Sequence, residues 1–362
     1  MDTDTRQPNT AGTGARPDAP APAWARLAAP LAACWAAIYG AVRLYWAATG
    51  LPDFPPIGSD LVFFEGAGGV VLCGCAVLIA GVLSAPRLPR RATRVLILAG
   101  VPIAATLVAM CALLMLDIAG LLFGLGVSTA LLPMGSRLGC LAVALLLTAA
   151  LVAAHRRIRP VCAYCGRAPH AAEPEPGAVP RWAFAAAYLA AASFALRIAA
   201  EVAAVSGGAQ GPLTAGAGGD LATLAAGSAF LAGAVMAGTV LPLAQVHRWG
   251  RVWPRWVLPL AGRAVPRWLV LGPGLVIGIG LVSYFGYAQV EMVAAAITGT
   301  GGFASFGGYG TAFFWTAVPA YLMWGAGLSV AAASYGIRTR PRCGHCGRGK
   351  RGMPESTGDH SE

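Results

Sequence analysis

The sequence has few charged residues and little of the chemistry that hydrolytic enzymes use. Only 11% of its 362 residues are charged, 15 are acidic and five are histidines. It contains no phosphate-binding glycine loop, no G-x-S-x-G elbow, no H-E-x-x-H pair and no paired carboxylates beside a base. We therefore do not expect an enzyme.

Lysine is almost absent, although the formal net charge is +11. The basic residues are arginines apart from Lys350, and they cluster between apolar runs, as they do in cytoplasmic loops. Tryptophans alternate with arginines over residues 247–267, which is typical of a belt at the lipid headgroups. The expected partners are the bilayer and, at these loops, anionic lipid headgroups, and not nucleic acid. The sequence indicates no protein partner.

Long apolar runs dominate the chain, which is 57% hydrophobic. A bilayer-spanning helix needs about 20 apolar residues, and backbone groups in lipid must be satisfied within helices. The predicted fold is an all-α polytopic membrane protein with eight transmembrane helices. Residues 119–135 form a further apolar connector, either re-entrant or interfacial, and Gly272-Pro273-Gly274 predicts a packing kink. The spans cover about residues 24–50, 60–83, 95–116, 138–154, 182–205, 220–246, 269–290 and 311–334.

The distribution of arginine also predicts the orientation. Placing both termini in the cytoplasm leaves only Arg43, Arg137 and Arg197 in or beyond the membrane. The reverse orientation would put every basic loop outside. We therefore expect a multi-pass protein of the inner (plasma) membrane with both termini cytoplasmic.

One stretch occurs twice, and it carries the most specific chemical signal. Apolar runs end in an arginine cluster, a proline and C-x-x-C-G-R, with cysteines at Cys162, Cys165, Cys343 and Cys346. Two C-x-x-C turns can present four thiolates to one zinc ion, and a closed four-sulfur site is structural. Two alternatives stay open: the pairs do not meet, or the thiols carry out dithiol redox chemistry. No thioredoxin-like pattern surrounds Cys343-Gly344-His345-Cys346.

The two halves match in the order of their landmarks, an arginine, an aspartate, a proline and the C-x-x-C pair. An even number of spans in each half predicts parallel repeats related by a pseudo-twofold axis along the membrane normal. The expected organisation, in chain order, is a disordered cytoplasmic tail, a four-helix repeat, a linker, a second four-helix repeat and a second disordered tail. These segments are 1–23, 24–167, 168–180, 181–348 and 349–362.

Charged residues inside apolar runs form a candidate membrane polar site. Such groups are costly in lipid and should face the bundle interior in pairs. One interpretation is a polar cavity for an ion, a proton or an anionic solute, and the other is salt bridges that fix helix packing. Asp117, Arg137 and Glu291 are expected to be solvated near the outer surface. The candidate residues are Arg43, Asp60, Glu65, Arg197, Glu201 and Asp220.

The run Arg43-Leu44-Tyr45-Trp46-Ala47 with Gly50, and the two C-x-x-C-G-R ends, resemble uncharacterised polytopic membrane proteins of actinobacteria. That resemblance implies a membrane location and no activity. The leading hypothesis is a transporter of a small solute or ion with a cytoplasmic zinc clasp. The alternatives are a non-transporting scaffold or regulatory partner and, further off, a membrane dithiol redox protein.

Overall fold

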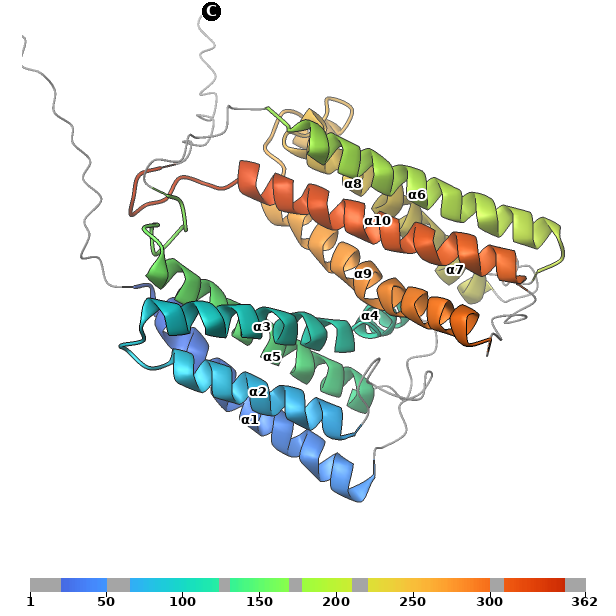
Figure 1. Ribbon diagram of the computed structural model, residues 1–362. Helices are drawn as coiled ribbons and strands as arrows, with labels where there is room; N and C mark the ends of the chain where they lie inside the picture. Colours follow the sequence, from blue (N-terminus) through green and yellow to red (C-terminus); the bar gives the residue numbers. More distant parts are fainter. Residues whose placement is uncertain are drawn as a thin grey trace, which may run out of the picture.

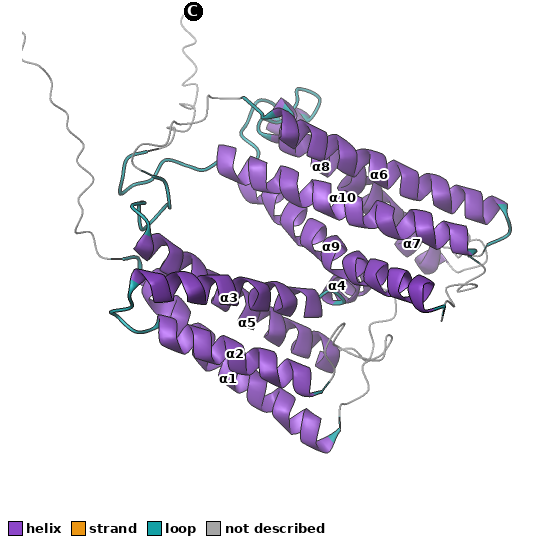
Figure 2. Ribbon diagram, viewed as in Figure 1, coloured by secondary structure: helices purple, strands orange, loops and turns teal. Residues whose placement is uncertain are grey.

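The computed structural model describes residues 21–50, 66–123, 131–168, 178–209, 221–299 and 309–348. These residues form helices and one isolated bridge between Val252 and Ala264, and they contain no β-strand (Figure 2). Within them, seven helical segments are long and apolar enough to cross a membrane. The all-α prediction is therefore confirmed, and the architecture is that of a polytopic membrane protein.

Four helices of the first half pack into one bundle (Figure 1). Its core is a single cluster rich in alanine, and it lets the backbones approach closely. Gly100 illustrates this, because a Cβ there would lie 2.6 Å from Leu151 of the facing helix. The helices are α1 (Ala23–Thr49), α2 (Ala67–Leu83), α3 (Arg90–Met110) and α5 (Leu131–Ile158).

The second half forms a separate bundle in which α10 lies between α6 and α9 (Figure 1). Single 3-10 turns at Arg248–Gly250 and Leu258–Leu260 interrupt the loop before α9. The helices are α6 (Arg181–Ser206), α7 (Leu221–Val235), the π-helix η1 (Met236–Val240), α8 (Leu241–Val246), α9 (Arg267–Thr298) and α10 (Thr311–Arg338).

The π-helix is a departure from the uninterrupted helix predicted over 220–246. Pro242 has no N–H to donate to the carbonyl of Gly238, four residues earlier. Leu241 instead donates its N–H to Met236, five residues back, which is the π pattern. Gly238 lies against Phe194 of α6 so closely that a Cβ there would overlap the ring. Local sequence and helix packing therefore favour the same irregular turn.

By contrast, Pro273 does not end its helix. α9, which is 32 residues long, continues through it, and glycines beyond it lie against α10. A Cβ on Gly278 would lie 2.9 Å from the backbone nitrogen of Ser329, and one on Gly325 would lie 2.9 Å from the carbonyl oxygen of Gly278. Glycine is required at this crossing because backbone atoms cannot move aside as a flexible side chain can.

A short helix, α4 (Leu114–Phe123), occupies the first part of the predicted connector. The preceding helix ends at Met110, earlier than expected. The prediction that Asp117 and Arg137 are solvated was wrong. Both are buried, and Arg137 Nη1 donates to both carboxylate oxygens of Asp117 at 2.6 Å, which fixes α4 on α5. An apolar neighbourhood leaves two opposite charges no alternative to pairing.

α4 also touches the second bundle. The sulfur of Met115 packs over Gly280 of α9, at 3.0 Å from the place of a Cβ on that glycine. Met115 also borders the core formed by α6, α9 and α10. The two bundles are therefore in contact through α4, which lies between them (Figure 1).

We expect Gly278→Ala to destabilise the protein by about 1–3 kcal/mol, because its methyl group must push α9 away from α10. Gly272→Ala is the matched control on the same helix, since a Cβ there meets nothing within 4 Å. Thermal unfolding of both variants in detergent checks this. Equal melting temperatures for the two variants would contradict the close crossing.

Candidate metal centre

The two C-x-x-C segments follow the ends of α5 and α10 and fold into the same turn. The N–H of Gly166 donates to the carbonyl of Cys162 at 2.7 Å, and the N–H of Gly347 donates to that of Cys343 at 2.9 Å. Both glycines have positive φ, +73° and +68°, which explains a glycine directly after each second cysteine. We call these two turns the knuckles, and this end of the molecule the cysteine end.

The knuckles bring all four sulfurs together. The sulfurs of Cys162, Cys165, Cys343 and Cys346 lie within 4.8 Å of one another, and those of Cys165 and Cys346 are 3.6 Å apart. A tetrahedral site with metal–sulfur bonds of about 2.3 Å needs sulfurs about 3.8 Å apart. A disulfide needs about 2.05 Å, and all four cysteines are free thiols. The spacing therefore fits a metal ion between the knuckles.

Backbone donors prepare one of these sulfurs for ionisation. At Cys343 burial opposes the charge, but backbone N–H groups of Cys346 and His345 stabilise the thiolate and lower its pKa to about 7. At Cys165 burial and the neighbouring thiols outweigh the N–H of Arg167 and raise the pKa to about 12. Without a cation, thiolates this close repel one another, and a bound metal ion removes that conflict.

Arginines join one knuckle to the other. Arg167 Nη1 donates to the carbonyls of Arg348 at 2.9 Å and of Pro341 at 3.1 Å. Arg348 returns a hydrogen bond to the carbonyl of Ala168 at 3.2 Å. Each arginine follows the glycine of its own knuckle, so the contacts are close to reciprocal.

A ring stack covers the same junction. Tyr164 and His345 occupy equivalent places in their knuckles, one residue before the second cysteine. Their rings stack with centroids 3.3 Å apart and an interplanar angle of 18°. The four-sulfur cluster thus lies in a small folded unit built from both halves, and its sulfurs can hold a metal ion with no open position for a substrate.

The charged residues predicted within the membrane are not part of this metal centre. Arg197 and Glu201 of α6 form an ion pair at 2.9 Å, and their side chains are 12% and 2% exposed. Tyr309 donates to Glu201 at 2.5 Å, and Arg197 Nε donates to the hydroxyl of Tyr321 at 2.6 Å. Arg197 also lies 5.1 Å from the ring centroid of Tyr321. We call these four residues the α6 polar cluster.

Arg43 is buried in α1 and lies 5.7 Å from the ring centroid of Trp46. Its predicted neighbours Asp60 and Glu65, and also Asp220, lie outside the described residues. The structure therefore brings together Arg197 and Glu201 from the predicted polar site. Sequence reasoning missed both tyrosines, because Tyr309 lies in a glycine-rich stretch before a predicted span and Tyr321 is one of several aromatic residues within it.

Comparisons of the chain with protein-family models, with curated proteins and with solved structures found no match. The resemblance to actinobacterial membrane proteins therefore stays a prediction, and the function has to be argued from the chain itself.

We expect the detergent-purified protein to hold about one metal ion per chain, lost in both Cys165→Ser and Cys346→Ser, because each removes a ligand of one shared site. Elemental analysis beside Cys34→Ser, which changes an exposed thiol on α1, measures this. Metal lost from only one of the two variants would show that the knuckles act separately.

Proposed function

We propose that this chain is an inner-membrane transporter of a small solute or ion, built as two parallel four-helix repeats that a structural zinc ion clasps at the cytoplasmic face. The observation that carries the transport proposal is the α6 polar cluster, in which Glu201 is buried and the other three residues are half-buried. The four parts of the proposal are supported by different observations: the zinc ion, the repeats, the orientation and the transport.

Zinc is proposed because four thiolates at tetrahedral spacing select zinc or iron, and zinc occupies closed four-cysteine sites without redox chemistry. The knuckles supply four sulfurs, backbone donors to Cys343 and Cys165, and arginines that tie the turns together. When bound, zinc would neutralise the thiolates and cross-link the ends of α5 and α10.

The duplication is supported by contacts that recur in both bundles. α5 packs between α1 and α3, and α10 packs between α6 and α9. Arg157 donates to the carbonyl of Leu83 at the end of α2, and Arg338 donates to that of Gln245 at the end of α8. Both arginines precede the first cysteine of their knuckle by five residues. Two independent bundles have no reason to share such a contact.

A second recurring pair lies deeper in the bundles. Leu151 contacts Gly100, and Ala332 contacts Gly274. Leu151 and Ala332 each precede the first cysteine of their knuckle by eleven residues. α2 then corresponds to the segment from α7 to α8, which makes it an eighth span although it has only 17 described residues.

The orientation is supported by the arrangement of arginine. Apart from Arg43, Arg137 and Arg197, every arginine in the described part of the chain belongs to the cysteine end, either in its loops or in the helix turns beside them. Positively charged loops stay on the cytoplasmic side. A reducing cytoplasm also keeps thiols available to metal.

The transport site is supported by the cost of burying charge. Ionisable groups within a membrane span are costly, and where they are kept they mark ion or substrate pathways. Glu201 can accept a proton or coordinate a cation, and Arg197 can attract an anion. Tyr309 and Tyr321 hold both in place. Since the ion pair joins neighbouring turns of one helix, releasing it requires no change in backbone.

Reporter fusions after Gly50 and after Ala85 test whether α2 crosses the membrane. We expect alkaline phosphatase to be active only at Gly50 and green fluorescent protein to fluoresce only at Ala85, because α2 would place them on opposite sides. The same reporter active at both positions would mean that α2 does not span, which would contradict the eight-helix repeat.

For transport, we expect Glu201→Gln to lower the transport rate by on the order of 100-fold, because a carboxylate buried at a transport site is required for binding or proton coupling. Glu291→Gln, which removes an exposed carboxylate on α9, should retain wild-type rates. Currents from proteoliposomes, recorded with inorganic ions, amino acids and small organic acids, measure this.

Arg197→Lys keeps the positive charge in the span and serves as a second variant, with equal membrane insertion as the control. If Glu201→Gln and Glu291→Gln transport equally, the cluster is a packing ion pair. If no compound in the panel moves, the non-transporting scaffold is the better hypothesis.

A further inference from the structure

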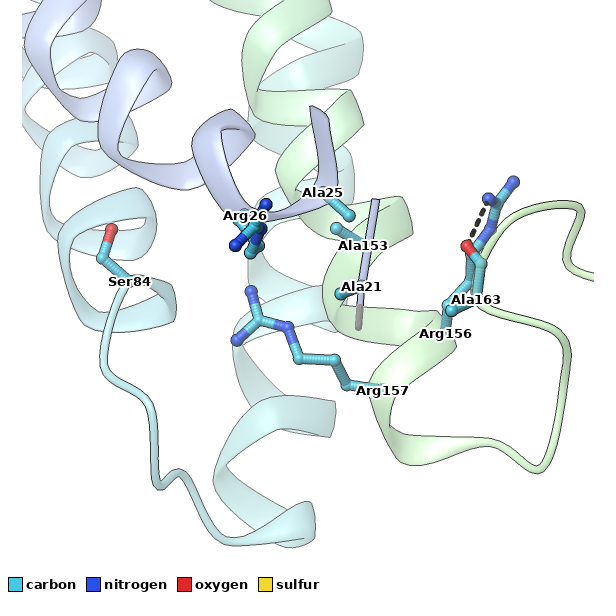
Figure 3. Close-up of a pocket in the computed structure, with 8 residues that line it drawn as sticks. All are labelled: Ala21, Ala25, Arg26, Ser84, Ala153, Arg156, Arg157 and Ala163. Carbon is cyan, nitrogen blue, oxygen red and sulfur yellow. Dashed lines mark hydrogen bonds between the residues drawn. The ribbon is translucent and has the colours of Figure 1, made fainter. Parts of the chain in front are cut away.

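A hollow of about 330 Å³ opens at the cysteine end of the first bundle (Figure 3). It lies where α1 begins, where α2 ends and where α5 ends. Three arginines line it, Arg26 from α1 and Arg156 and Arg157 from α5, together with Ser84 and small alanines. We call it the arginine hollow.

Two of the arginines are held in place by backbone carbonyls. Arg157 Nη1 donates to Leu83 at 3.3 Å, and Arg156 Nη1 donates to Ala163 and Tyr164 at 3.2 and 3.0 Å. In Figure 3 the guanidinium group of Arg157 extends toward Arg26, whereas Arg156 turns to Ala163. Arg26 and Arg157 therefore line the same hollow from different helices.

No acidic side chain among the described residues offsets this charge. The carboxylates in that part of the chain are Asp117, Glu201 and Glu291, all on α4, α6 and α9 and away from the hollow. α1 begins beside the hollow without an acidic residue in its first turn and without a side-chain cap. Like charges that converge without a counterion are unfavourable, so the site is complementary to an anion.

We propose that the arginine hollow binds a phosphate group, with Arg26 and Arg157 as its principal donors. Arginine's planar fork matches phosphate oxygens in pairs, and the hollow has a volume in the range of small-ligand sites. Its place at the ends of membrane-spanning helices puts that phosphate at headgroup depth, where it can come from an anionic phospholipid or from free phosphate. This site is independent of the transport proposal.

The test uses the full-length, detergent-purified protein and native mass spectrometry. The probe is dioctanoyl phosphatidylglycerol, and dioctanoylglycerol is the matched lipid without phosphate. We expect Arg26→Gln to weaken phosphatidylglycerol binding by about 10-fold or more, because it removes a charge-assisted fork. Arg255→Gln, which removes an exposed arginine from the loop after α8, should bind within about 2-fold of wild type.

Inorganic phosphate added as a competitor separates the two sources. Displacement of the lipid would show a site that also takes free phosphate, and no displacement would show a site for the lipid headgroup, and either result supports the proposal. Equal binding of the two lipids, or equal losses in Arg26→Gln and Arg255→Gln, would overturn it.

A further control variant changes Asp18, a carboxylate only three residues before Ala21, the first residue that lines the hollow. Phosphatidylglycerol binding that appears only in Asp18→Asn would assign the hollow to the chain's own carboxylate and would also overturn the proposal. Unchanged metal content and melting temperature in Arg26→Gln serve as the folding control, and Arg26→Lys, which keeps the charge without the fork, should bind with intermediate affinity.

Discussion

The convergence of four sulfurs from residues 181 positions apart is the constraint on which the rest of this structure depends. Four sulfurs within 4.8 Å of one another leave the chain little freedom in how the ends of α5 and α10 are positioned. Each knuckle then fixes the last turn of its helix, from which Arg157 and Arg338 reach the ends of α2 and α8. Through these contacts the junction of the knuckles is connected to the ends of four helices, α2, α5, α8 and α10.

Inside the bundles a different constraint applies. Lipid offers no hydrophobic gain between helices, so close approach of small residues takes its place. Gly100, Gly274 and Gly278 lie at such crossings. The same solvent makes buried charge expensive, and the two ion pairs among the described residues are each enclosed by protein. Arg137–Asp117 fixes a helix to its own bundle, whereas Arg197–Glu201 lies within one helix and adds no such link.

Hydropathy predicted most helices well, because about 20 apolar residues have one stable state in lipid. The repeated C-x-x-C motif likewise predicted which sulfurs would meet. Residues whose role depends on a distant partner were not predictable in this way. The sequence around Asp117 reads as an apolar connector, and only the position of Arg137 makes it a helix held by an ion pair. The π turn at Met236–Val240 needed both Pro242 and the ring of Phe194. Tyr321 contacts Arg197 from α10, and Tyr309 contacts Glu201 from the segment just before α10.

The position of α4 has a mechanical consequence. The two bundles are joined at the knuckles and again where α3 and α4 contact α9 and α7, with Met115 packed over Gly280. A motion that separated the bundles would have to break the contacts at one of these two places, so the halves of the molecule resist being pulled apart even though each has its own core.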